Sequence, residues 1–247
     1  MSAAVEADNL AKVFSGLRAV DGVTLRVAPG ERRALIGPNG AGKTTLFHCV
    51  TGTLRVSSGQ VRLFGNEVTN LPEYRRTERG MGRTFQITNV FPDLTLAENL
   101  ALSVVGTDRR KWICHRPLSA FPDIRARSLA GLDAVGLRDR ADHPVRLLSY
   151  GERRQLELAL ALATHPKVLF LDEPCAGLSP SERTRIFNMI RALPRDITLV
   201  MIEHDMDVAL GLADRVTVMN RGRVMVEGTP DEVQQNAQVR DVYFGHV

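Results

Sequence analysis

The stretch that decides the fold is Gly37-Pro38-Asn39-Gly40-Ala41-Gly42-Lys43-Thr44-Thr45, which fits the pattern G-x-x-x-x-G-K-[ST]. Glycines in such a loop let backbone N–H groups turn inward and form a concave anion site. A short apolar strand is predicted over 33–36, and a helix over 43–51 points its positive end at the same anion. The pattern therefore predicts that residues 37–45 bind the phosphates of a nucleotide.

Two side chains of this loop carry its chemistry. Lys43 is expected to reach the β- and γ-phosphates, and the hydroxyl of Thr44 is expected to ligate Mg²⁺. The sequence therefore predicts ATP and Mg²⁺ as the cofactors.

Further polar residues follow apolar strands in the last third of the chain. Asp172 and Glu173 come directly after Leu169-Phe170-Leu171, so Asp172 suits an outer or water-mediated contact with Mg²⁺ and Glu173 suits polarisation of an attacking water. Solvated acids at a strand end would explain the pair equally well without the phosphate loop. His204 follows a strand predicted over 197–202, on the ligand side of a parallel sheet, although a surface histidine is the alternative.

Leu148-Ser149-Tyr150-Gly151-Glu152 opens a long helix, expected over 153–164. Ser149 and Glu152 form a capping box, which is the purely structural explanation. A free helix N-terminus with a serine and a glycine is also a second anion site. A single chain with two anion sites needs an explanation.

The remaining pattern is that of an α/β protein. Short strands are expected in the first 30 residues and near 59–64, helices with capping boxes at Thr95 and Ser179, and a hairpin around 220–222. Thr229 is expected to start the final helix. Strands that alternate with helices imply a mostly parallel sheet, and the helix-rich middle is predicted to be an insertion in it.

Composition limits the classes of function. The net charge of +4 includes no run of like charges, so nucleic acid is not an expected partner. Cys49, Cys114 and Cys175 are widely spaced, which argues against disulfides and zinc and for a reducing compartment. No signal peptide or membrane-spanning stretch is apparent, so we expect a cytoplasmic protein whose membrane role, if any, needs partners.

The ordered set of motifs resembles the ATP-binding cassette (ABC) family over essentially the whole chain. It comprises 37–45, Gln86, LSYGE at 148–152, FLDEP at 170–174, GLS at 177–179 and His204. The resemblance implies one domain over 1–247: an α/β P-loop NTPase with a RecA-like core, an N-terminal antiparallel β-subdomain and an inserted α-helical subdomain over 87–150. It also implies that two cassettes dimerise head to tail with ATP between them.

The resemblance assigns a role to each residue. Phe14 would stack on adenine, and Gln86 would touch Mg²⁺ and the water and relay the ATP state to the insertion. Glu173 would be the catalytic base and His204 the γ-phosphate switch. Ser149 and Gly151 would act on the ATP of the other cassette. The sequence departs from the commonest pattern in two places, with Glu152 where Gln is frequent and Ser179 where Asp is frequent.

Within the family the chain looks like the importer branch for branched-chain amino acids. This resemblance lies in 80–86, 176–180, 202–206 and 242–245. It implies membrane permease subunits and, indirectly, a periplasmic solute-binding protein as partners, with the chain peripheral on the inner face of the membrane. The alternatives are a soluble ABC ATPase of DNA repair or translation, a cassette that binds ATP without turnover, and the ATPase of a lipid exporter. We interpret Trp112, Cys114 and His115 as local packing.

Overall fold

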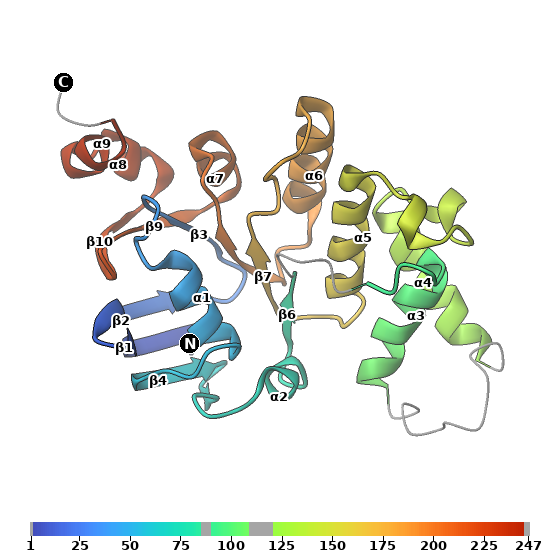
Figure 1. Cartoon of the computed structure of the whole chain (residues 1–247), viewed down its shortest axis with the longest axis horizontal. Coiled ribbons are helices and arrows are strands. Elements are labelled where there is room, and N and C mark those ends of the chain that lie inside the picture. Colours follow the sequence, from blue (N-terminus) through green and yellow to red (C-terminus); the bar gives the residue numbers. More distant parts are fainter. Residues whose placement is uncertain (1, 85–89, 109–120, 245–247) are drawn as a thin grey trace.

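The computed structural model describes residues 2–84, 90–108 and 121–244 and consists of two sheets and a group of helices (Figure 1). The first sheet is antiparallel in the order β2-β1-β4-β5. Its strands are β1 (Val5–Phe14), β2 (Leu17–Val27), β4 (Ser58–Leu63) and β5 (Asn66–Glu67). The expectation of short strands at the N-terminus is wrong, since β1 and β2 have 10 and 11 residues. Register shifts after Ala7 and Leu10 interrupt the alternation of apolar residues without ending the pairing.

The second sheet carries the strands that lead to residues 37–45, Asp172 and His204, and it has the order β10-β9-β3-β8-β7-β6. Its strands are β3 (Arg32–Ile36), β6 (Met81–Arg83), β7 (Val168–Asp172), β8 (Thr198–Ile202), β9 (Arg215–Asn220) and β10 (Arg223–Gly228). All neighbours are parallel except the β9–β10 hairpin. The predicted parallel sheet and hairpin are therefore confirmed. Every residue of β3, β7 and β8 is buried, as layers on both faces require.

Helices cover both faces of this sheet. α1 (Lys43–Thr51) lies between the two sheets, where Phe47 packs edge-on against Phe170 at 5.4 Å between ring centroids. The opposite face is covered by α6 (Pro180–Ala192) and α7 (Met206–Leu212), with α8 (Pro230–Gln235) and α9 (Ala237–Phe244) near the C-terminus. The expected single final helix is wrong, because the chain becomes extended at Asn236, whose side chain then accepts the N–H of Val239.

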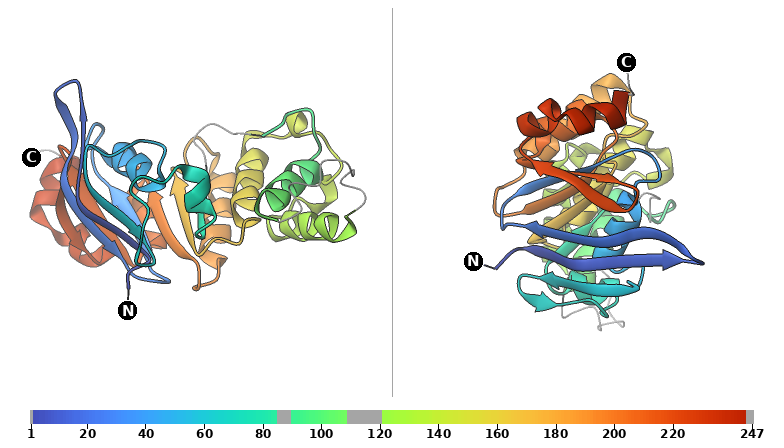
Figure 2. Two further views of the ribbon diagram at one scale, coloured as in Figure 1. Left: turned by 90° about the horizontal axis from the view of Figure 1, so that it is seen from below. Right: turned by 90° about the vertical axis from the view of Figure 1, so that its left-hand side faces the viewer.

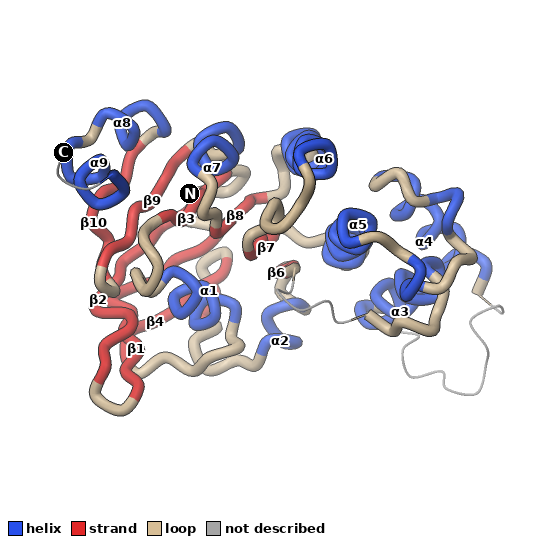
Figure 3. The backbone as a smooth tube through the Cα atoms, turned by 45° about the horizontal axis from the view of Figure 1, so that its top comes forward, coloured by secondary structure: helices blue, strands red, loops and turns tan. Residues whose placement is uncertain are grey.

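The third part is the helical group at the far end of the molecule from β1 and β2 (Figures 2 and 3). It contains α3 (Leu96–Thr107), α4 (Pro122–Ala134) and α5 (Tyr150–Leu162), with 3-10 turns at Arg138–Arg140 and Val145–Leu147. The capping box at Thr95 is confirmed. α5 begins three residues earlier than expected, because the Ser149–Glu152 box supports a full first turn.

α5 belongs to two cores at once. Leu156 and Ala159 pack with α3 and α4, whereas Leu158 and Ala161 pack with the parallel sheet.

The predicted limits of the insertion, 87–150, stay a prediction. Among the described helices, none combines the length and the apolar character that crossing a bilayer requires.

The C-terminus of α1 is held by a buried arginine on α2 (Glu73–Thr77), a short helix that was not predicted. Arg76 is 1% exposed and donates to the carbonyls of Cys49 and Val50 on α1 and to those of Thr69 and Leu71. Burial lowers the pKa of Arg76 to about 10, which leaves it charged at neutral pH. The guanidinium therefore satisfies helix-end carbonyls that would otherwise be buried without donors.

Substituting Arg76 with methionine is expected to lower the free energy of unfolding by about 2–4 kcal/mol, because those carbonyls lose their donors. Urea denaturation measures the change. Arg75→Met on the same helix is the control, since the Arg75 side chain is 54% exposed and its contacts, with Glu78 and the Tyr74 ring, lie at the surface. Its effect should stay within about 0.5 kcal/mol. Equal effects of the two substitutions would contradict this role.

Candidate functional site

The loop over 37–45 can adopt its path only with glycine at two positions. Gly37 has φ 149° and Gly42 has φ 96°. A Cβ at Gly37 would lie 2.2 Å from the carbonyl oxygen of Met219, and one at Gly42 would lie 2.2 Å from that of Ala19. The loop therefore sits directly against the end of β9 and the start of β2.

The β9–β10 hairpin braces the loop. The N–H of Gly222 donates to the carbonyl of Ala41 at 2.9 Å, and the carbonyl of Gly222 accepts the N–H of Asp21 at the same distance. The turn predicted at 220–222 thus lies beside the phosphate loop, which the sequence did not indicate. These two hydrogen bonds fix the hairpin turn against the backbone of the loop.

Lys43 is folded back under the loop. Its Nζ donates to the carbonyls of Gly37 at 2.7 Å and Pro38 at 3.0 Å, and the residue is 4% exposed. Burial lowers the pKa of Lys43, and the charge of Glu173 partly opposes that shift. A phosphate in the loop would offer this ammonium charged acceptors in place of two neutral carbonyls.

Asp172 is a buried carboxylate at the end of β7. It is 1% exposed, and within the described part of the chain neither of its oxygens has a hydrogen-bond partner. Burial, and secondarily the charge of Glu173, raises its pKa. A buried carboxylate with free oxygens is suited to a hard cation, and Mg²⁺ prefers oxygen ligands of this kind. Together with the half-buried Thr44 hydroxyl, Asp172 fits the predicted Mg²⁺.

Glu173 and His204 meet across two neighbouring strands. Nε2 of His204 lies 2.8 Å from Oε1 of Glu173. β7 and β8 are adjacent and parallel, so the residues that follow them emerge at one edge of the sheet. Glu173 has φ 47°, uncommon for a side-chain-bearing residue, and its N–H donates to Ile202. This geometry suits an acid–base pair beside a phosphate, and the two assigned roles stay predictions.

Phe14 lies at the tip of the β1–β2 hairpin with 41% of its surface exposed. Nζ of Lys12 lies 4.8 Å from the centroid of its ring and covers one face. A base that stacks on Phe14 must therefore use the other face.

Ser149 and Gly151 begin α5, which Figure 1 separates from α1 by β6 and β7. The Ser149 hydroxyl accepts the N–H of Glu152 at 3.2 Å, and the carboxylate of Glu152 accepts the N–H of Ser149 at 2.9 Å. Glu152 thus caps its own helix and also pairs with Arg140 at 3.3 Å. A single chain does not bring the second predicted anion site to the first.

Several predicted residues cannot be placed. Gln86, Trp112, Cys114 and His115 lie outside the described residues. Cys49 and Cys175 are described, and both are free and buried.

Glu203 is a residue of this site that sequence reasoning missed. It is 3% exposed, precedes His204, and accepts the N–H of Cys175 at 3.2 Å. The loop after β7 and the loop after β8 are thereby tied together. A carboxylate directly before His204, immediately after an apolar stretch, was the available signal.

Burial raises the pKa of Glu203 from 4.5 to about 7. The folded chain thus holds this proton more tightly than the unfolded chain, so the stability that it contributes is complete below pH 4.5 and is lost as the pH rises through about 7. Glu203→Gln keeps an oxygen for Cys175 and does not titrate. We expect the unfolding free energy of the wild type to fall relative to Glu203→Gln by about 2–3 kcal/mol over this range. Urea titrations at several pH values measure this difference in unfolding free energy, and Glu67→Gln, at an exposed residue, is the control. A difference that does not change with pH would contradict the raised pKa of Glu203.

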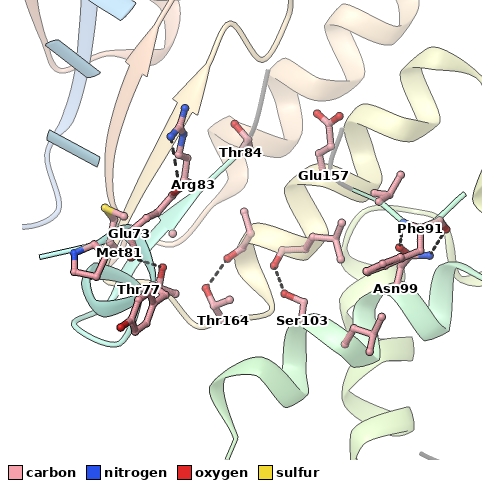
Figure 4. A pocket seen from close by; sticks show the side chains of 17 residues that line it. Glu73, Thr77, Met81, Arg83, Thr84, Phe91, Asn99, Ser103, Glu157 and Thr164 are labelled. Atoms are coloured by element: carbon pink, nitrogen blue, oxygen red, sulfur yellow. Dashed lines mark hydrogen bonds and ion pairs between the residues drawn. The ribbon is translucent and has the colours of Figure 1, made fainter. Parts of the chain in front are cut away.

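A groove of about 680 Å³ lies between the parallel sheet and the helical group (Figure 4). One wall comes from α2 and β6, and the other from α3 and α5. Large apolar side chains are exposed at its edges, with Tyr74 62%, Phe91 58% and Leu102 39% exposed. Glu73 and Glu157 add carboxylates to its lining.

Family models match most of the sequence. Residues 20–176 match the model described as ABC transporter. Residues 223–247 match the model described as branched-chain amino acid ATP-binding cassette transporter.

Individual proteins resemble the chain from end to end. The high-affinity branched-chain amino acid transport ATP-binding protein BraF of Pseudomonas aeruginosa is 36% identical over 248 residues, which cover 98% of this chain and 97% of BraF. The protein LivG of Escherichia coli, with the same description, is 36% identical over 94% of each chain. A nucleotide-free ATP-binding cassette from an ABC transporter superimposes with a TM-score of 0.86 at 30% identity, over 100% of both chains. The ADP conformation of MJ1267, another such cassette, gives 0.86 at 29% identity, also over 100% of both.

Proposed function

Because this chain belongs to the ATP-binding cassette ATPases of ABC transporters, we propose that it drives the uptake of branched-chain amino acids. The observation that carries this proposal is the end-to-end similarity to two branched-chain amino acid transport ATP-binding proteins. The match of residues 223–247 supports the same branch of the family. The place of action in this proposal is the inner face of the cell membrane.

The proposed cycle uses two cassettes, this chain and a second copy or a sister subunit. ATP lies between the loop 37–45 of one cassette and Ser149 and Gly151 of the other. The separation of these two elements in one chain supports this arrangement, since neither is complete alone. Phe14 receives the adenine on the ring face that Lys12 leaves open.

Hydrolysis in this proposal is the work of the residues after β7 and β8. With Mg²⁺ bound, Thr44, Asp172 and Gln86 would hold it, and the ion would neutralise charge on the phosphates. Glu173 takes the proton of the attacking water, and His204, hydrogen-bonded to Glu173, contacts the γ-phosphate. The contact of His204 with Glu173 supports a coupling between the state of the γ-phosphate and the position of the base.

The groove is the proposed docking site of a membrane permease subunit. Its exposed apolar side chains suit the apolar face of a partner helix, and Glu73 and Glu157 suit basic residues beside that face. A solute-binding protein acts only indirectly, through the permease. DNA, ribosomes and exported lipid are the partners and cargo of the alternative functions.

Two measurements test the proposal. Cells that lack this chain should lose uptake of radiolabelled leucine, isoleucine and valine, and loss of a different solute instead would overturn the cargo. Leu102→Cys in the groove should cross-link to a membrane subunit, whereas Leu17→Cys, at a hairpin residue that is 70% exposed, should not. Cross-links from Leu102→Cys only to ribosomal or DNA-bound proteins would overturn the importer function.

A further inference from the structure

A line of polar side chains on α5 connects the groove to the loop that carries Glu173. Tyr150, Arg154 and Glu157 are spaced four and three residues apart, so they share one face of the helix. This face is turned toward the sheet, because a small internal void beside it is lined by Arg154 and Glu157 together with Leu171 of β7. Glu157 also lines the groove, where Figure 4 shows it on the wall formed by α5.

The contacts along this line are continuous. Arg154 donates from Nη1 to Glu157 at 2.9 Å and from Nη2 to the hydroxyl oxygen of Tyr150 at 3.0 Å. The Tyr150 hydroxyl in turn donates to the carbonyl of Ala176 at 3.4 Å. The N–H of Ala176 donates to the carbonyl of Glu173 at 3.1 Å. Each donor is used once, so the hydroxyl bridges the guanidinium and the loop.

Stability alone does not explain the ion pair at the centre of this line. The side chains of Arg154 and Glu157 are only 9% and 7% exposed, so both charges have lost most of their hydration. Well-packed apolar side chains would stabilise such a position at least as well. What a planar guanidinium adds is two fixed donors that hold two partners at a set geometry.

The contact between Tyr150 and Ala176 is the point at which this chain of hydrogen bonds leaves α5. Tyr150, Arg154 and Glu157 all lie on one helix and move with it, whereas Ala176 belongs to the loop between β7 and α6. Among the three side-chain hydrogen bonds described above this one is the longest, so a small rotation of α5 is enough to make or break it. The Tyr150 ring also packs beside Gly177, where φ is 71° and a Cβ would lie 3.4 Å from the ring.

We propose that Arg154 is a positioning residue that ties the groove wall at Glu157, through the hydroxyl of Tyr150, to the loop that sets the place of Glu173. This inference rests on the proposed docking of a permease in the groove. A partner helix seated there moves α5, and Arg154 carries that movement to Ala176. The hydrolytic base is thereby brought into place when the groove is filled.

The test uses the whole transporter, with its membrane subunits in liposomes. The readout is the ratio of ATP hydrolysis with the loaded solute-binding protein to that without it. Tyr150→Phe removes only the hydroxyl, and Arg154→Met combined with Glu157→Gln removes both charges without stranding one. Each should lower the ratio at least about threefold. The variant that combines all three substitutions should lower the ratio no further than Tyr150→Phe or the double variant does, because the three residues act through one chain of contacts. Arg153→Met on the same helix is the control and should keep the ratio.

One further measurement separates this inference from the docking proposal. Cross-linking from Leu102→Cys reports docking, and it should be unchanged in the Tyr150→Phe background. An unchanged ratio with intact cross-linking would overturn the role of Arg154 and leave docking untouched. If the decreases in the ratio add up in the variant with all three substitutions, the residues do not act through one chain of contacts. A wild-type groove that forms no cross-link would overturn docking and, with it, this inference. A merely structural effect would lower both rates together and leave their ratio unchanged.

Discussion

Glu173→Gln is expected to retain ATP binding and to lower turnover by at least about 100-fold. Glutamine has the size of glutamate and can still accept a hydrogen bond from His204, which lies 2.8 Å from the carboxylate in the wild type. It cannot take a proton from water. ATP should therefore stay bound between two cassettes, and the variant should accumulate as a dimer when ATP and Mg²⁺ are present.

Phosphate release measures turnover, equilibrium binding of a fluorescent ATP analogue measures affinity, and light scattering after gel filtration measures the dimer. The control is Glu67→Gln, since Glu67 is an exposed residue of β5, a strand of the antiparallel sheet, whereas Glu173 follows β7 of the parallel sheet. It should leave all three readouts unchanged. Normal hydrolysis by Glu173→Gln would show that Glu173 is not the base.

Lys43→Met is expected to weaken ATP binding at least about 100-fold. The ammonium is 4% exposed and sits directly beneath the loop, so its bonds to phosphate oxygens would be charge-assisted and shielded from water. The loss of two such bonds, at about 1.5–3 kcal/mol each, exceeds a 100-fold change in affinity. Methionine keeps the length of the side chain and removes the charge.

The carbonyls of Gly37 and Pro38 lose their donor in this variant, so thermal unfolding must accompany the binding measurement. Lys167→Met is the matched control, because Nζ of Lys167 lies 5.9 Å from the centroid of the Phe64 ring and outside the loop. It should bind ATP as the wild type does. Tight binding by Lys43→Met would remove Lys43 from the phosphate site.

The sequence predicted well whatever depends on neighbouring residues. Helix α1 spans the predicted residues, because the glycine loop and the strand before it fix where it starts. The capping boxes at Thr95 and Ser149 follow from contacts three residues apart. The α/β ATP-binding cassette fold is confirmed by the solved cassettes that share it over the full chain. The predictions that failed are the short first strands, the start of α5 and the single last helix. They concern where elements begin and end, which local pattern determines poorly.

The roles of Glu173, His204 and the loop stay predictions, but their arrangement came only from the structure. The contact of Glu173 with His204 exists because β7 and β8 became neighbours. No local periodicity encodes that order of strands. The isolation of Asp172 has the same origin, since burial depends on every layer around it.

By itself, the sequence determined the path of the glycine loop over 37–45, because two glycines permit it, and it predicted that the backbone of this loop binds phosphate. The tertiary structure decided what surrounds that loop. The N–H of Gly222 donates to Ala41, and Glu203 accepts the N–H of Cys175 from the neighbouring loop. Arg154 donates to Tyr150, which contacts the loop that carries Glu173. The physical reason is how far apart in the sequence the contacting residues lie. A backbone nest is closed by adjacent residues, whereas these contacts join segments that only the packing of sheet and helices brings within hydrogen-bond distance.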